Sequence, residues 1–230
     1  IWATNSLQSG AAGADGTGLW ANGTSRGRIL GSKKLIPATN DFTVLLWMRT
    51  TNTTSPEKHL FTNNRGQAGR CNLSQDATPG KMTWWVNNTY GLVSVSAGTG
   101  PAVDDGVWHQ VGISRNGKTF RLWVDGGIVS SATSAAANPA VTQANDWFIA
   151  SNASDAGAAF YGAVGTGYAL MDDLRVYNYG LDATAVANLY SAFTPLPAGT
   201  PFAPETDHSA IEAATGGTVV GHLPTISGES

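Results

Sequence analysis

The segment WHQVGISRNGKTFRLWVDG, residues 108–126, contains two runs of strand-forming residues joined by a turn. The first run, residues 108–114, leads into Asn116-Gly117, a dipeptide strongly favoured in two-residue hairpin loops. The return run, residues 119–124, is closed by a second turn dipeptide, Asp125-Gly126. The segment therefore predicts an antiparallel β-hairpin followed by a further turn.

Similar short strands are expected on both sides of this hairpin, at residues 42–49, 81–87, 147–150 and 171–177. No long helical period separates them, so the pattern favours an antiparallel sandwich over a fold of alternating strands and helices. One short helix is expected from Asp182 to Tyr190, with Asp182 as its N-cap.

The chain changes character after residue 193, which predicts one sandwich over residues 1–193 and an extended arm over 194–230. Regular structure in the arm is interrupted by Pro195, Pro197, Pro201 and Pro204, and the remainder is rich in Gly and Ala. If this arm is ordered, we expect the sandwich or a neighbouring protein chain to hold it.

The composition excludes several classes of function. Charged residues make up 13% of the chain and the net charge is −3, which gives no general attraction to nucleic acid or to anionic lipid. No apolar run approaches the length needed to span a bilayer, so we expect no membrane insertion. The single cysteine, Cys71, has no partner for an internal disulfide. A surface of small hydroxyl and amide side chains suits an extracellular, cell-surface or virion-surface location.

Three stretches together resemble the laminin-G-like branch of the concanavalin A-like lectin/glucanase superfamily. The first covers the opening strands, with LWANGTS at 19–25 and DFTVLLW at 41–47. The second covers the central hairpin, with WHQV at 108–111 and LWVDG at 122–126. The third covers the closing strand and the helix after it, with MDDLRVYN at 171–178 followed by Leu181 and Leu189-Tyr190. The resemblance implies an all-β, antiparallel jelly-roll β-sandwich of two curved sheets with about a dozen strands. It does not imply one function, because relatives include binding, adhesion and virus-particle proteins.

Glycosidases on this fold need two carboxylates on one strand, and that pattern is missing, so we expect no enzyme activity. A polysaccharide lyase that uses Tyr and His is the remaining alternative, although no spacing of these residues points to it. The glutamates are scattered, at Glu57, Glu205, Glu212 and Glu229. Asp172 and Asp173 are adjacent on a strand and are expected to point to opposite faces. Neither His59 nor His109 has a sequence neighbour that suggests a nucleophile, and His109 matches a structural histidine of the family.

A structural calcium ion is one possibility that the resemblance raises. Asp172 matches an aspartate that binds calcium in many relatives, with backbone carbonyls from early turns, here near Asn22-Gly23 and Gly31, as further ligands. The alternative is that Asp172 or Asp173 accepts hydrogen bonds from loop amides or pairs with Arg175.

Three tryptophans fall on the polar register of different strands: Trp47, Trp85 and Trp123. Trp85, Trp123 and Arg121 are the candidate sugar platform, with Trp47 as a further candidate, because sugar rings stack on exposed aromatic faces and polar neighbours bind the hydroxyls. Burial of these rings under loops, under the arm or against a protein partner is the alternative.

Two hypotheses about function follow. In the first, the domain is a non-catalytic, lectin-like recognition or adhesion module that binds a glycan or polysaccharide as part of a larger surface assembly. In the second, it is a structural or decoration protein of a virus particle, attached to protein neighbours through residues 194–230.

Overall fold

The computed structural model describes residues 2–4, 8–12, 17–21, 26–29, 32, 35–51, 58–63, 71–75, 80–88, 91–96, 100–135, 146–150 and 169–193. The predicted arm, 194–230, lies outside these residues, so its extended conformation and its role in attachment stay predictions. Within the described part, no helix is long and apolar enough to cross a membrane.

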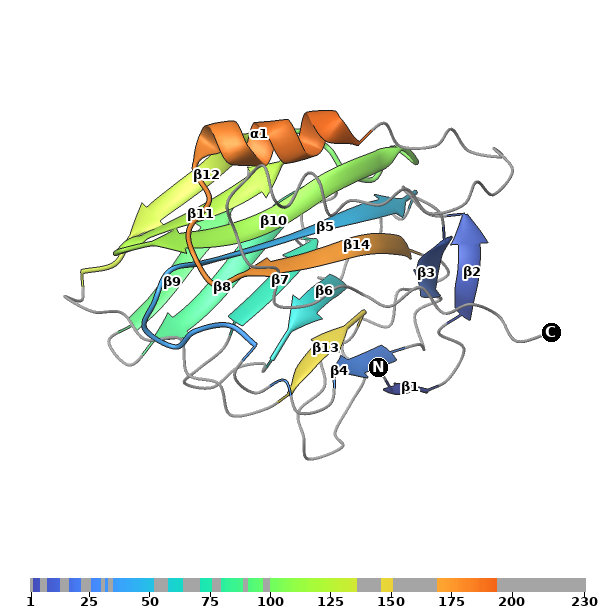
Figure 1. The fold of residues 1–230 in the computed structure, drawn as a ribbon, viewed down its shortest axis with the longest axis horizontal. Helices are drawn as coiled ribbons and strands as arrows, with labels where there is room; N and C mark the ends of the chain where they lie inside the picture. The colour runs from blue at the N-terminus through green and yellow to red at the C-terminus, as the bar shows by residue number, and fades with distance from the viewer. Residues whose placement is uncertain are drawn as a thin grey trace.

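The described strands form two seven-stranded sheets in which every pairing is antiparallel (Figure 1). Sheet A has the order β1 (Trp2–Thr4), β4 (Arg26–Ile29), β13 (Trp147–Ile149), β6 (Lys58–Thr62), β7 (Cys71–Gln75), β8 (Met82–Asn88) and β9 (Gly91–Ser96). Sheet B has the order β12 (Gly127–Thr133), β11 (Thr119–Val124), β10 (Trp108–Asn116), β5 (Phe42–Thr50), β14 (Ala169–Tyr177), β3 (Thr17–Ala21) and β2 (Gln8–Ala12). The all-β antiparallel sandwich is confirmed.

The core lies between the sheets and takes alternate residues of each strand, as the pleat of a strand requires. Phe42, Val44, Leu46 and Met48 of β5 enter it from sheet B, as expected from the sequence. Leu73, Met82 and Trp84 enter it from sheet A. Cys71 is also inside, and its burial raises the pKa of the thiol to about 12, although Nε1 of Trp84 donates to its Sγ at 3.3 Å.

The two glycine turns have different geometries. Asn116 pairs with Thr119, so the loop residues are Gly117-Lys118, one position later than the sequence indicated. Gly117 alone has a positive φ, +59°, which fits a type II′ turn. Asp125 and Gly126 both have positive φ, +50° and +75°, as a type I′ turn requires, and the chain returns along β12.

The helix α1 (Ala183–Ala192) begins where the sequence predicted, because the Asp182 carboxylate accepts a hydrogen bond from the Ala185 amide at 2.8 Å. It lies across the outward face of sheet B (Figure 1). Gly126 allows this contact, since a Cβ at that position would lie 3.0 Å from Cβ of Tyr190. One outward face of the sandwich is therefore covered by the chain's own helix.

Candidate functional site

Trp123 lies on the outward face of sheet B, but α1 covers it. Its side chain is 1% exposed and belongs to an apolar cluster with Leu45, Tyr177, Leu181, Val186 and Leu189. Its Nε1 donates a hydrogen bond to Oγ of Ser114 at 2.9 Å. The ring is a packing residue between the sheet and the helix and offers no free face to a sugar.

Trp47 is also on this outward face and is fully buried. It stacks on Tyr190 with ring centroids 5.6 Å apart and an interplanar angle of 21°, and it contacts Phe193 at 6.2 Å. The alternation that placed Trp47 and Trp123 away from the core was right, and of the two interpretations offered for these rings, an exposed sugar platform or burial, the structure shows burial. The cause is the docking of residues 181–193, which fills this face.

The predicted platform is also divided between the two sheets. Arg121 and Trp123 belong to β11 in sheet B, whereas the backbone of Trp85 belongs to β8 in sheet A. The outward faces of two packed sheets point in opposite directions, so these residues do not form one surface. The Trp85 side chain lies outside the described part of the structure, and its role in binding stays a prediction. Arg121 is half-buried.

The outward face of sheet A carries a polar network that the sequence analysis did not find. Nδ1 of His59 lies 2.9 Å from Oδ1 of Asn72 and 3.1 Å from Oγ of Ser74. Asn72 and Ser74 alternate with the core residues Cys71 and Leu73, so their side chains point away from the core. All three are buried, with exposures of 6% or less.

Thr83 belongs to the same face, because Ser74 is its partner in the pairing of β7 with β8. Its side chain is 1% exposed, and its Oγ1 has no hydrogen-bond partner. A buried hydroxyl without a partner is costly, and such groups call for a specific explanation. Thr83 thus adds a free hydroxyl to the network of imidazole, amide and hydroxyl groups. These four residues, His59, Asn72, Ser74 and Thr83, are named the sheet A polar cluster.

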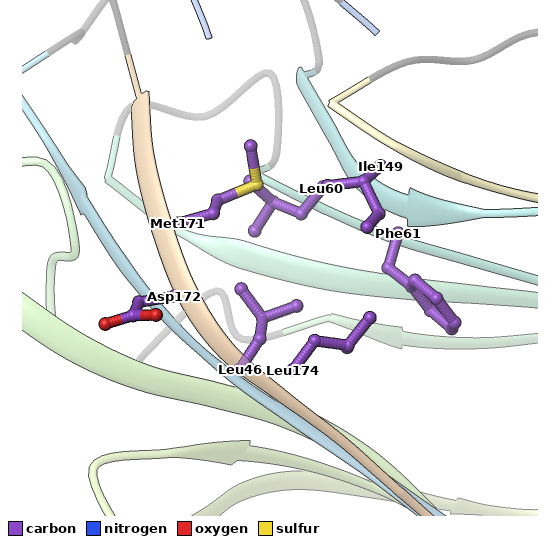
Figure 2. A pocket seen from close by; sticks show the side chains of 7 residues that line it. All are labelled: Leu46, Leu60, Phe61, Ile149, Met171, Asp172 and Leu174. Atoms are coloured by element: carbon purple, nitrogen blue, oxygen red, sulfur yellow. The ribbon is translucent and has the colours of Figure 1, made fainter. Parts of the chain in front are cut away.

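A small apolar pocket also lies between the two sheets (Figure 2). Leu46, Met171 and Leu174 line it from sheet B, and Leu60, Phe61 and Ile149 from sheet A. Asp172 borders it, but its carboxylate points away from the apolar side chains (Figure 2). The other six lining side chains are apolar and offer no hydrogen bond to a sugar, so the pocket is part of the core.

Asp172 lies at a β-bulge, where Asp173 and Leu174 together oppose one residue of β5. Asp173 has a φ of +47°, a conformation that Asp tolerates better than most residues. The Asp172 carboxylate accepts a hydrogen bond from the Asp173 amide at 2.8 Å, and both carboxylate oxygens of Asp173 accept from Nε of Arg175 at 2.8 and 2.9 Å. These are the hydrogen-bond and ion-pair roles that the sequence analysis offered as the alternative to calcium.

The described residues do not by themselves form a calcium site. Among them, no three His, Cys, Asp or Glu residues are grouped to hold a metal. Of the adjacent pair, Asp173 is engaged by Arg175, which leaves Asp172 as the candidate ligand. The early turns near residues 22–25 and Gly31 lie outside the described part, so calcium stays a prediction from the resemblance.

That prediction has a direct test in the thermal stability of the protein. If Asp172 binds calcium, the melting temperature is higher with excess calcium than with EDTA, because a ligand that binds the folded state stabilises it. Asp172→Asn is then expected to abolish the difference. Equal melting temperatures of the unaltered protein in both buffers would show that Asp172 holds no stabilising calcium ion.

Of the residues considered for catalysis, the structure describes the two histidines but not the four glutamates. Glu57, Glu205, Glu212 and Glu229 lie outside the described residues. His109 binds Asp125 and Asp105. His59 has no serine beside it in the sequence, but strand pairing brings Oγ of Ser74 to 3.1 Å from its Nδ1. However, Nδ1 of His59 also faces the Asn72 amide within a buried network.

The family is identified by sequence and the fold by structural likeness. The family model of the concanavalin A-like lectin/glucanases superfamily, Laminin_G_3, matches residues 22–187, and the chain belongs to this superfamily. A search of curated proteins by sequence gives no match.

Solved structures with this fold are distant in sequence. The binding domain of Paraclostridial Mosquitocidal Protein 1 has a TM-score of 0.62 at 15% identity, covering 81% of this chain and 45% of the other. Domain 4 of AbnA, a GH43 extracellular arabinanase from Geobacillus stearothermophilus, in complex with arabinotriose, has a TM-score of 0.60 at 19% identity, with coverages of 81% and 82%. The ligand binding domain of Botulinum neurotoxin serotype D in complex with N-acetylneuraminic acid has a TM-score of 0.59 at 10% identity, with coverages of 83% and 46%. The chain thus spans about half the length of the two toxin domains, and these likenesses establish the fold.

Proposed function

We propose that the chain is a non-catalytic carbohydrate-binding module, and that the sheet A polar cluster contributes to its binding site. The observation that carries this proposal is the buried Oγ1 of Thr83, which has no partner although it lies beside a hydrogen-bonded network. Because the four side chains are 6% exposed or less, a sugar reaches them only when the part of the protein that covers them moves aside. A sugar hydroxyl can both donate to and accept from such a group, as can the amide, imidazole and hydroxyl around it.

The arrangement of the two sheets supports this choice of face. On sheet B the outward residues are sealed by α1 and Phe193, which leaves Trp47 and Trp123 inside apolar clusters. On sheet A the outward face of β6, β7 and β8 carries the sheet A polar cluster, although Phe148 of β13, on the same face, is apolar and buried. A ligand rich in hydroxyl groups fits the second face and not the first, because buried polar groups need hydrogen-bond partners.

The comparisons support a binding role for the fold without defining the ligand. The similar structures named above are binding domains or, for AbnA domain 4, a domain in complex with a neutral oligosaccharide. We infer from them that the glycan is the partner to test first. Attachment through residues 194–230 to protein neighbours on a cell or virion surface stays a prediction from the sequence. Deletion of the arm should abolish attachment and leave glycan binding intact.

Thr83→Val provides the sharpest test of the proposed site. Valine keeps the shape of threonine and removes a hydroxyl that has no partner within the protein, so the free energy of unfolding should stay equal or increase. Binding of the strongest ligand from a glycan array, or of arabinotriose as a first probe, should weaken about three- to tenfold by calorimetry.

The matched control is Thr133→Val, which removes a hydroxyl from an exposed residue of β12 in the other sheet. Its affinity for the same ligand should equal that of the unaltered protein. Unchanged affinity in Thr83→Val, with the protein folded and the ligand bound, would place the site elsewhere. Failure of the protein to bind any glycan would overturn the proposed function itself.

A further inference from the structure

The loop at residues 100–107 lies between β9 and β10 and packs against the core. Val103 is fully buried in the core, and its amide donates to the Gly80 carbonyl at 3.0 Å. Gly106 is fixed on both sides: its amide donates to the Thr50 carbonyl at 3.0 Å, and Nε of Arg49 donates to its carbonyl at 2.6 Å. None of these contacts involves an atom of a histidine.

A further contact of this loop does depend on a histidine. Nδ1 of His109 lies 2.8 Å from Oδ2 of Asp125, in the turn between β11 and β12. Nε2 of the same ring lies 3.1 Å from Oδ1 of Asp105, in the loop. The imidazole is therefore the link between two segments that are distant in sequence.

Protonation decides how many of these contacts can form. An imidazolium has two N–H donors, one for each carboxylate, whereas a neutral imidazole has one donor and one lone pair. A lone pair that faces a carboxylate oxygen at this distance is repelled. Loss of one proton must therefore break one of the two links.

We propose that His109 is a pH-dependent latch: the imidazolium ties the loop at residues 100–107 to the turn at Asp125-Gly126, and loss of the Nε2 proton releases Asp105 and loosens the loop. Asp105 is the contact that is lost because its side chain is 51% exposed and water can solvate it. Asp125 is 25% exposed, and its other oxygen accepts from the Gln110 amide at 3.0 Å, so it retains the Nδ1 proton.

The pKa shifts of His109 and Asp105 have the directions expected for an imidazolium held between two carboxylates. Burial acts to lower the pKa of His109, but the hydrogen bonds and charges of Asp125 and Asp105 outweigh it and raise the pKa above its usual value. The pKa of Asp105 is lowered by the Val107 amide and by His109, despite some burial. Of the other elements nearby, β5 presents the uncharged Met48 opposite His109, with Arg49 bound to Gly106. On α1, burial and the charge of Asp125 raise the pKa of Tyr190.

The sign of the pH effect follows from the raised pKa. The latch stabilises the folded protein fully below the pKa of an unfolded histidine, about 6.5. This contribution is lost as the pH rises through the higher pKa of folded His109. The loop should therefore open more easily on the alkaline side of this range.

Nitrogen NMR of His109 tests the latch directly. Below its pKa both ring nitrogens should be protonated, and above it the neutral ring should carry its proton on Nδ1. Over the same titration, the hydrogen-exchange protection of the Gly106 and Val107 amides should fall by about threefold, after correction for intrinsic exchange. A neutral ring protonated on Nε2, or protection that does not follow the titration of His109, would overturn the proposal.

Two variants of the loop separate the latch from general charge effects. Asp105→Asn should lower the pKa of His109 and make loop protection independent of its titration. Asp104→Asn removes the same charge from a neighbouring residue whose carboxylate lies beside Gly80, so the latch should persist. Equal behaviour of the two variants would contradict the role of Asp105.

Discussion

Replacing Trp123 with alanine is expected to lower the free energy of unfolding by about 3–5 kcal/mol, the range for loss of a large buried aromatic residue. The ring is 1% exposed and packs between sheet B and α1. Its loss leaves a cavity beneath Val186 and Leu189 and removes the hydrogen bond to Ser114. Urea denaturation followed by tryptophan fluorescence or circular dichroism measures the change.

Trp123→Phe is the matched control for this prediction. Phenylalanine keeps an aromatic ring in the cluster but cannot donate to Ser114, so we expect a smaller loss of stability than for alanine. Glycan affinity, measured per folded molecule, should be unchanged in both variants. A stable Trp123→Ala protein with lost glycan binding would restore Trp123 as a sugar-contacting residue and contradict the structure of this face.

The second large effect is expected at Asp173, whose carboxylate is the ion-pair partner of the buried Arg175. Arg175 is 1% exposed, and its guanidinium lies 4.7 Å from the centre of the Phe193 ring. Burial acts to lower the pKa of Arg175, but the Asp173 carboxylate outweighs it and raises the pKa. Asp173→Asn leaves a buried charge unpaired and should cost about 3–5 kcal/mol of unfolding free energy.

Asparagine is a suitable replacement because it tolerates the positive φ of this position, so backbone strain does not confuse the result. The double variant Asp173→Asn with Arg175→Met removes both charges and should recover most of the stability, since a buried ion pair can be replaced by apolar groups at little cost. Full stability of the single variant would mean that water solvates the Arg175 charge and would contradict the burial of the pair.

Much of the fold could be predicted from the sequence, because strong alternation and turn dipeptides are local signals. The strands β5, β8, β10, β11, β13 and β14 and the helix with its Asp182 cap were found within a few residues. The strands β1, β2, β4, β6, β7, β9 and β12 were missed as separate elements. Several of them are short, and β12 carries mostly small residues, so their local pattern is weak.

The candidate site was harder to predict because it depends on contacts between distant segments. Alternation correctly placed Trp47 and Trp123 away from the core, but it could not reveal that residues 181–193 dock on the same face. The polar cluster had a faint signal in Asn72 and Ser74, which alternate with Cys71 and Leu73. Their meeting with His59 depends on strand pairing, which periodicity within one strand does not specify.

The most direct test of the central claim is NMR mapping of the amides that respond to the strongest-binding glycan from an array. Shifts are expected to concentrate on β6, β7 and β8, around Asn72, Ser74 and Thr83, while α1 and β14 remain unperturbed. Shifts concentrated on α1 and the outward face of sheet B, with none around Thr83, would contradict the assignment of the binding face.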